Sequence, residues 1–336
     1  MIDWVKANLP LSEPLDLPHG RIVRISPDGE IEWDLKAWLE VPSSSGDTRI
    51  RLRVSGDLLE VSGNPSKWLQ GHNLWGSDDL VNLTVDMTLA ALEALSVRPN
   101  PADEAGWRTG GFGVKLAHVA VMFDLGSDDA VVEYLRWLEG APASNRRVHG
   151  LRKGSTVSWT TRALRMKAYH KLQELLDTKQ LANHDLRDEL LAWASGKLRW
   201  EVELRSRELR RLKLDLGVLW KGLDATSVAL AYAKLVEMPT RQNPRMAHLD
   251  VPQHLRGTLF LWAQGVDLRV ALSRRTYYRH RKELLAYGVD IARPPTNEER
   301  MRPFEAMVCP FPPLHELPVA TPPADLVAKL RAKVLS

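Results

Sequence analysis

Apolar and polar residues alternate along two stretches in the middle of the chain, and both stretches predict β-strands. Over residues 162–171, Leu164, Met166 and Ala168 lie on one face, and the opposite face carries Tyr169 among basic side chains. Over residues 197–205, a tryptophan and aliphatic residues alternate with arginines and with Glu201 and Glu203. If the two polar faces lie close together, a phenol, carboxylates and cations share one surface. Two edge strands with solvated charged faces are the plainer alternative.

The periodicity elsewhere predicts a mixture of strands and helices. Residues 1–61 predict short strands joined by turns, including a hairpin over 21–33, and the apolar run 113–125 predicts a buried strand. Apolar spacings of three and four residues predict helices over 79–95, 128–138, 172–181, 184–194 and, with interruptions, 207–236. We therefore expect an α+β fold, in which flanking helices cover a central antiparallel sheet.

A polar, proline-bearing linker over 239–252 separates a second predicted module from this sheet. Three short helices are predicted beyond it, over 252–264, 266–272 and 274–287, with a turn at Gly265. Short helices about a tight turn, the last of them basic, are typical of a helix-turn-helix DNA-binding module. A small helical dimerisation or scaffold element would show the same pattern.

The last of these helices carries the side chains expected to contact DNA. In its first turn, Arg274, Arg275 and Tyr277 are expected to reach base edges. We expect phosphate contacts from Arg279, Arg281 and Lys282.

Composition narrows the class of protein and its compartment. The chain has 336 residues, 44% of them hydrophobic and 26% charged, as in ordinary soluble globular proteins. Length and linker composition predict a large domain at 1–240, a helix-turn-helix module at 250–295 and a proline-rich tail with a short terminal helix at 301–336. The single cysteine, Cys309, excludes an internal disulfide and a thiolate metal cage. No apolar run is long enough to span a membrane and no signal peptide is evident, so we expect a cytoplasmic protein.

Charge and absent motifs narrow the chemistry further. The net charge is +4 and the pI is about 9.1, which favours a polyanionic partner. The sequence lacks a Walker A loop, a dinucleotide-binding glycine turn, the His-hydrophobic-His triplet of common nicking enzymes and any histidine spacing typical of zinc. The candidate chemistry that remains is that of a phenol, carboxylates and cations on one surface. These groups suit attack on a phosphodiester.

One segment, residues 62–76, combines glycines, a proline and polar residues in a distinctive order: Pro65, Lys67, Leu69, Gln70, Gly71, His72, Asn73, Leu74, Trp75 and Gly76. In this order the segment resembles one found in the gene II replication initiators of filamentous bacteriophages. Further segments agree in order and spacing, namely Met1 to Asp3, the stretch with Tyr169, Lys171 and Glu174, and the stretch with Arg199 and Glu201. The resemblance is strong over about residues 1–240 and weaker over 274–288.

The resemblance implies a rolling-circle replication initiator. Such a protein nicks one strand of the double-stranded phage origin with Mg²⁺ or Mn²⁺, stays linked through tyrosine to the 5′ phosphate, and later joins the displaced single strand into a circle. Its implied partners are origin DNA in both forms, the host helicase and the host polymerase, and its implied location is the cytoplasm of the bacterial host. Nicking and joining would belong to residues 1–240.

The implied roles fall on residues of the alternating stretches and of the motif. Tyr169 would be the nucleophile, with Lys171 and Lys167 favouring its phenolate and holding phosphate. The metal ligands are expected to come from Glu201, Glu203 and Asp124. DNA contacts are expected from Arg165 and Arg199. The remaining motif residues are Lys67, Gln70, His72 and Asn73, and for His72 a structural role is weighed against proton transfer.

One departure from the family concerns the metal site. Where the family carries an Arg-hydrophobic-Asp step, this chain has His118, Val119 and Ala120. Alanine cannot bind a metal, so either Asp124 or His118 would have to replace the lost ligand. The departure motivates a second hypothesis, an origin-binding replication regulator that cuts weakly or not at all. A general RNA-binding factor is a third hypothesis, supported only by the basic charge.

Overall fold

A computed structural model of the chain describes residues 1–43, 48–139, 141, 143, 147–149, 155–237, 251–287, 289–295 and 311–334. The fold is α+β with a large antiparallel sheet, as expected. The chain forms two compact units, one made of Met1–Glu237 and Pro313–Ser336, and the other of Met238–Pro312. The two units are described separately below.

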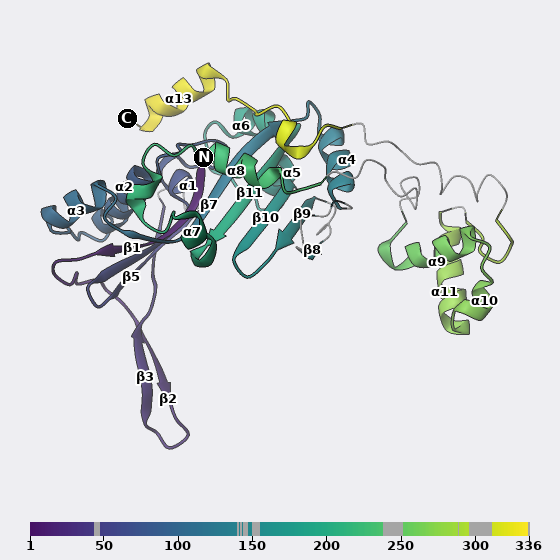
Figure 1. Cartoon of the computed structure of the whole chain (residues 1–336), viewed down its shortest axis with the longest axis horizontal. Helices are drawn as coiled ribbons and strands as arrows, with labels where there is room; N and C mark the ends of the chain where they lie inside the picture. The colour runs from purple at the N-terminus through teal and green to yellow at the C-terminus, as the bar shows by residue number, and fades with distance from the viewer. Residues whose placement is uncertain are drawn as a thin grey trace. The chain divides into compact units, whose positions relative to one another are not determined.

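The larger unit is built on one antiparallel sheet (Figure 1). Across the described part of the sheet, the strands follow in the order β4 (Leu39–Pro42), β5 (Arg49–Ser55), β6 (Leu58–Gly63), β1 (Ile2–Pro10), β7 (Gly113–Asp124), β11 (Lys197–Arg205), β10 (Leu164–His170), β9 (Thr156–Thr160) and β8 (Arg147–His149). Strand β7 is almost wholly buried and lies between β1 and β11. Residues that are far apart in sequence therefore meet at the centre of the sheet.

The two alternating stretches of the sequence pair directly with each other. Strand β10 runs antiparallel to β11, with Lys167 opposite Glu201 and Tyr169 opposite Arg199. Residues directly opposite share a face of the sheet, so the two polar faces form one surface, and the alternative of two edge strands is wrong.

The opposite, apolar face of these strands is covered by helices. Trp200 on this face donates its indole N–H to the carbonyl of Ala229, at 2.9 Å, in α8 (Ala225–Ala233). Trp159 of β9 donates similarly to Ala141, just beyond α4 (Asp128–Glu139), and its ring packs edge-on against Trp200. Burial of these large rings fixes which face of the sheet remains polar.

The remaining helices of the larger unit lie along loops between the strands. They are α1 (Pro65–Gln70), α2 (Leu80–Glu93), α3 (Pro101–Arg108), α5 (Lys171–Asp177), α6 (Arg187–Ala194), α7 (Ser206–Leu212) and the 3₁₀ helix η1 (Gly217–Trp220). Helix α5 starts directly after β10, and α1 follows β6, so both emerge beside the polar face. In the described part of the chain, no helix combines the length and apolar character needed to cross a bilayer.

The C-terminal segment packs against the larger unit. The backbone of Asp124 donates to Pro318 at 2.9 Å, and Ala320 donates to Met122 at 2.8 Å, so the segment runs along the end of β7. After η3 (Leu314–Glu316), helix α13 (Ala324–Val334) buries Leu326 in an apolar cluster with side chains of α5 and α6. The terminal helix was predicted. The expected tail at 301–336 does not form a region of its own, because from Pro313 onward it belongs to the larger unit. Residues 296–310 lie outside the described part of the chain.

The smaller unit contains the three helices predicted after the linker. They are α9 (Gln253–Ala263), α10 (Leu268–Ala271) and α11 (Arg274–Leu285). Ser273 caps α11 by accepting a hydrogen bond from the backbone N–H of Thr276. Leu255, Trp262, Tyr277 and Leu284 are among the side chains of a shared apolar core.

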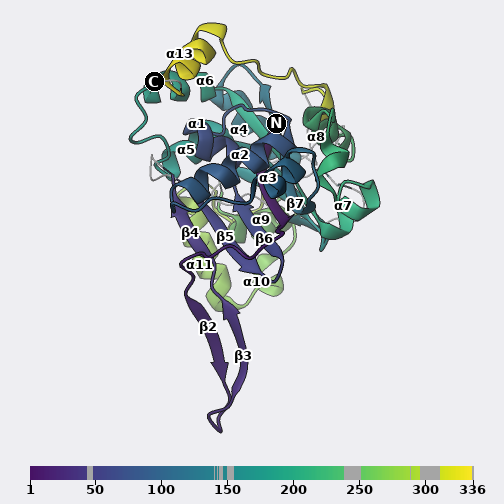
Figure 2. The ribbon, with the colours of Figure 1, turned by 90° about the vertical axis from the view of Figure 1, so that its left-hand side faces the viewer.

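A two-stranded ribbon projects from the sheet of the larger unit. Strands β2 (Arg21–Ile25) and β3 (Ile31–Lys36) form the predicted hairpin, and Figure 1 and Figure 2 show it extending beyond the edge that carries β4 and β5. We call residues 21–36 the arm.

Candidate active site

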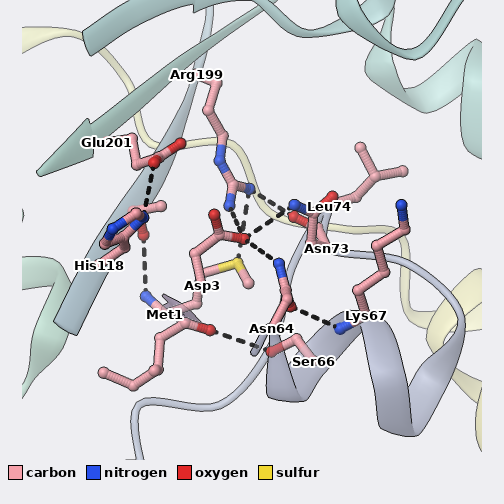
Figure 3. A network of polar contacts seen from close by, with 12 residues as sticks. Met1, Asp3, Asn64, Ser66, Lys67, Asn73, Leu74, His118, Arg199 and Glu201 are labelled. Carbon is pink, nitrogen blue, oxygen red and sulfur yellow. Dashed lines mark hydrogen bonds and ion pairs between the residues drawn. The ribbon is translucent and has the colours of Figure 1, made fainter. Parts of the chain in front are cut away.

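Three adjacent strands bring Asp3, His118 and Glu201 together on the polar face of the sheet. Asp3 lies on β1, His118 on β7 and Glu201 on β11, and one ligand-type atom from each lies within 4.8 Å of the others. Figure 3 shows the three side chains converging. We call them the Asp–His–Glu cluster.

Three donors from two segments, the motif at 62–76 and strand β11, hold Asp3 in place. Its Oδ1 accepts hydrogen bonds from Asn64 at 3.0 Å and Asn73 at 2.9 Å, and lies 2.8 Å from Nη2 of Arg199 (Figure 3). Arg199 is fully buried. Burial would lower the pKa of its guanidinium, but Asp3 and the other groups around it, Tyr169, Glu201 and Glu174, together outweigh this effect and the pKa is raised. The ion pair is therefore maintained in the interior, where either partner alone would be costly.

Glu201 is the most connected carboxylate of the cluster. Its Oε1 lies 2.8 Å from Nζ of Lys167 and 3.0 Å from Nδ1 of His118. Burial alone would raise the pKa of Glu201, but Lys167 and His118 outweigh it and hold the pKa well below its usual range. Glu201 therefore stays ionised and can serve as an anionic ligand.

Tyr169 is linked to the cluster through this carboxylate. Its hydroxyl donates to Oε2 of Glu201 at 3.3 Å. The ammonium groups of Lys167 and Lys171 lie 5.6 Å and 5.9 Å from the centre of its ring. Burial, and next the charge of Glu201, raise the pKa of the phenol well above its ordinary value. The phenol is therefore protonated in this arrangement, and Lys167 and Lys171 do not offset the effect of burial.

Lys171 lies at the start of α5 and connects the tyrosine to the motif loop. Its Nζ is fully buried and contacts Oδ1 of Asn73 at 3.1 Å and Oε2 of Glu174 at 2.8 Å. Burial lowers the pKa of this ammonium, although Glu174 acts against that effect. Asn73 also donates a hydrogen bond to Asp3. This one side chain therefore connects Lys171 to the Asp–His–Glu cluster through two hydrogen bonds.

The motif at 62–76 folds into a short helix and a tight loop, and its residue types explain this shape. Asn64 caps α1 by accepting from the N–H of Lys67 at 2.8 Å, and Gly71 ends the helix at φ +79°, where a side chain would be strained. A Cβ on Gly76 would lie 2.5 Å from Oγ of Ser66, so the loop can close only with glycine there. The Gln70 amide donates to two carbonyls of the loop. Lys67 itself is buried at the base of α1.

His72 shapes this loop as a neutral side chain. It is buried, its Nδ1 accepts from the N–H of Leu74 at 3.3 Å, and its ring lies 4.5 Å from that of Trp75. Burial lowers the pKa of His72 to about 3. These contacts support the structural role weighed for His72 from sequence.

The Asp–His–Glu cluster has the chemistry of a divalent metal site. Two carboxylates and an imidazole on a rigid sheet could together hold one divalent cation. Nε2 of His118 is shielded from solvent, and no group in the described chain donates or accepts a hydrogen bond there. Lys167 and Arg199 already neutralise the two carboxylates, so a bound cation would share these anions with them.

Other metal candidates from the sequence lie outside the cluster. Asp124 is at the far end of β7, where it pairs with Lys197 at 3.2 Å and accepts from the N–H of Gly126. Glu203 lies nearer, 3.8 Å from Nε2 of His118, but Arg205 holds its other oxygen at 2.6 Å. The structure thus places His118, rather than Asp124, beside Glu201, and it adds Asp3 as a third candidate ligand.

The residues proposed to contact DNA fall into two groups. In the larger unit, Arg165 lies on the polar face beside Glu203, whereas Arg199 is buried and structural. In the smaller unit, the side chains on the outer surface of α11 include Arg274, Arg275, Tyr278, Arg279 and Lys282.

Two predicted contacts in α11 have other partners. Tyr277 is 4% exposed and belongs to the core, whereas its neighbour Tyr278 is 56% exposed. Helical geometry turns consecutive side chains by about 100°, so only one of the two rings can face outward. Arg281 forms an ion pair with Asp290 at 2.7 Å.

Comparisons with known proteins agree with this architecture. The model for the N-terminal region of a family described as "Replication-associated protein" matches residues 1–223, and the model for the C-terminal region of the same family matches residues 246–307. The chain is 32% identical over 312 residues to the replication-associated protein of Enterobacteria phage I2-2, an alignment that covers 87% of this chain and 88% of the relative. The two matched regions correspond to the two structural units.

Proposed function

Because this chain belongs to the replication-associated protein family of filamentous phages, we propose that it starts rolling-circle replication of such a phage by nicking origin DNA. The observation that carries the proposal is the hydrogen bond of 3.3 Å between the Tyr169 hydroxyl and Glu201, a member of the Asp–His–Glu cluster. A nucleophile and a candidate cation site share that carboxylate.

In the proposed reaction, Tyr169 exchanges one phosphate ester for another. Its oxygen attacks the scissile phosphorus, the bond from phosphorus to the 3′ oxygen breaks, and the 5′ phosphate becomes attached to tyrosine. The phenol loses its proton and the departing 3′ oxygen gains one, which leaves a 3′ hydroxyl to prime synthesis. Reversal by a 3′ hydroxyl joins the displaced strand without ATP, since the tyrosyl ester conserves the phosphodiester bond.

The surrounding residues have distinct proposed tasks. Mg²⁺ or Mn²⁺ on Asp3, His118 and Glu201 would supply positive charge to the scissile phosphate. Lys171 and Lys167 flank the Tyr169 ring and would stabilise negative charge as the phenol proton leaves. Asn73 orients both Asp3 and Lys171, so it acts through them as a positioning residue.

We assign origin recognition to the smaller unit. The basic outer surface of α11, with Arg274, Arg275 and Arg279, suits the major groove of the double-stranded origin. Tyr278 replaces Tyr277 as the aromatic side chain able to reach the DNA. The joining step would use single-stranded origin DNA, host helicase and polymerase would act on the nicked product, and the reaction would take place in the cytoplasm of the bacterial host.

A nicking assay on supercoiled origin DNA tests the proposal. With Mg²⁺ or Mn²⁺, the protein should convert the DNA to open circles, and Tyr169→Phe should slow this by at least about a thousandfold. Tyr232→Phe is the matched control, because Tyr232 is also a buried tyrosine whose hydroxyl donates to a glutamate, Glu208. Equal nicking by the Tyr169→Phe variant would remove Tyr169 from the mechanism.

The ion pairs that Lys167 and Arg199 form with the Asp–His–Glu cluster favour one alternative function, an origin-binding regulator. Lys167 and Arg199 balance the two carboxylates that a metal would need. Tight origin binding with no nicking by the wild-type protein, in either metal, would support the regulator and reject the nuclease.

A further inference from the structure

The arm exposes an unusual amount of apolar surface for so short a segment. Its exposed apolar side chains, between 40% and 64% accessible, are Ile22, Val23, Ile25, Ile31, Trp33 and Leu35. Ile22 lies directly opposite Leu35, so apolar side chains from both strands adjoin one another. Contiguous exposed apolar patches of this kind usually mark an interaction site.

The base of the arm is anchored to the larger unit, which presents the ribbon outward. Nδ1 of His19 donates to the carbonyl of Ala37 at 3.1 Å, and its Nε2 accepts from the N–H of Val54 at 3.2 Å in β5. Beyond this base, β2 and β3 pair only with each other among the described residues. An isolated two-stranded ribbon is marginally stable in water, and addition of further strands stabilises it.

The charge of the arm argues against nucleic acid as its occupant. Residues 21–36 contain three basic and four acidic side chains, so their net charge is −1. Two of the three basic groups are also engaged within the ribbon, since Arg21 pairs with Asp34, and Arg24 lies 2.7 Å from Glu32. A ribbon that binds phosphates would need a free positive surface.

We propose that the arm pairs with the arm of a second copy of this chain, through the outer edge of β2. In an antiparallel pairing centred on Val23, Arg24 of one copy lies opposite Ile22 of the other, so like charges do not meet. The pairing is self-complementary, as a twofold interface requires, and it forms a four-stranded sheet from two marginal ribbons. Near-neutral charge and apolar side chains fit association with an identical surface.

The choice of β2 rather than β3 follows from the surroundings of each strand. Strand β3 lies against β5 at the base of the arm, whereas the outer edge of β2 has its backbone groups open along its length in the described structure. Unpaired backbone N–H and C=O groups on such an edge are the natural template for another strand.

Sedimentation equilibrium of the full chain tests the association. We expect a monomer–dimer equilibrium. Its association constant should fall about tenfold or more in an Ile22→Ser, Leu35→Ser variant, because the variant has less apolar surface to bury when two arms associate. The matched control is Val218→Ser with Leu219→Ser, which changes two equally exposed apolar residues outside the arm and should leave the dimer intact.

A cysteine at the centre of the pairing tests its register. In a Cys309→Ser background, Val23→Cys should form a disulfide-linked dimer on mild oxidation, because residues opposite each other in antiparallel strands lie within disulfide reach. Asp34→Cys, on the other strand of the arm, should not. A monomeric wild-type chain, a dimer that survives the serine substitutions, or no cross-link at position 23 would each overturn the proposal. A wild-type chain that is monomeric, together with arm variants that lose origin affinity, would instead identify DNA as the occupant.

Discussion

Asp3 illustrates how a residue with little sequence signal becomes central to the site. Asp3 belongs to no recognisable metal-binding motif. Only its place in the opening segment shared with the family could have identified it. In the fold, β1 lies between β6 and β7, so Asp3 meets Asn64, Asn73 and Arg199 from distant parts of the chain. Such a meeting depends on strand order, which the periodicity of one sequence does not specify.

His118 and Asp124 were the two sequence candidates to replace the lost acidic ligand, and their variants should behave differently. His118→Gln should weaken Mn²⁺ binding about tenfold or more, because the imidazole lies 3.0 Å from Glu201 within the cluster. Asp124→Asn should leave binding unchanged, since its carboxylate pairs with Lys197. Isothermal titration of both variants with Mn²⁺ checks this, and the reverse order of effects would refute the assigned ligands.

His72 predicts a specific loss of stability in acid. Its pKa falls from 6.5 to about 3 on burial, so the unfolded chain takes up a proton at a higher pH than the folded chain does. The stability is therefore fully present above pH 6.5 and falls by roughly 1.4 kcal/mol per pH unit below it. His72→Asn keeps an acceptor for Leu74 but cannot titrate, so its urea-unfolding free energy should depend less steeply on pH in that window. Equal slopes for the two proteins would contradict a buried neutral His72.

At the scale of elements, strong periodicity predicted the strands that build the site. Strands β7, β10 and β11 occur where alternation or a buried run placed them, and the pairing of β10 with β11 joins their polar faces. Helices α2 and α4 also agree with the apolar spacing.

Weaker local signals account for the elements that were missed. Helix α3 was not predicted; it begins at Pro101, and proline suits a first helical turn. Strand β9 was not predicted either, because its own sequence does not show its pairing with β10. The helical stretch predicted with interruptions over 207–236 is confirmed as α7, η1 and α8, with Gly217 at the start of η1 and Gly222 between η1 and α8.

The motif loop offers a test of how tightly α1 and its following turn are closed. Gly76→Ala would place a methyl group 2.5 Å from Oγ of Ser66, which itself donates to Ile2, and should destabilise the chain by about 1–3 kcal/mol. Nicking should fall with it, because the same loop carries Asn73. Gly106→Ala in α3 is the control, since a Cβ there meets nothing within 4 Å. Chemical denaturation of both variants checks the difference, and an unchanged Gly76→Ala protein would contradict the close packing.

At the scale of the whole molecule, the chain leaves the larger unit and returns to it. The sequence indicated the linker and the three helices beyond it, but it did not identify the elements on which the residues from Pro313 onward pack. That packing rests on backbone contacts with β7 and on apolar contacts of α13 with α5 and α6, all between residues distant in sequence. Proline content in the tail gave no indication of these partners.

Substitutions in the two apolar cores should separate the two units in thermal unfolding. Leu326→Ala removes a buried side chain of α13 and should destabilise the larger unit by about 2–4 kcal/mol. Leu255→Ala in α9 should affect the smaller unit instead. Differential scanning calorimetry of both variants checks the assignment. A Leu326→Ala effect confined to the transition that Leu255→Ala shifts would contradict it.

The central claim is that Tyr169 becomes joined to the 5′ phosphate of nicked DNA, and peptide mass mapping of the protein–DNA adduct tests it most directly. After reaction with an origin oligonucleotide and Mn²⁺, nuclease digestion and proteolysis, the peptide containing Tyr169 should carry a 5′-phosphorylated nucleotide. Cleaved DNA with no adduct, or an adduct on another residue, would contradict the account.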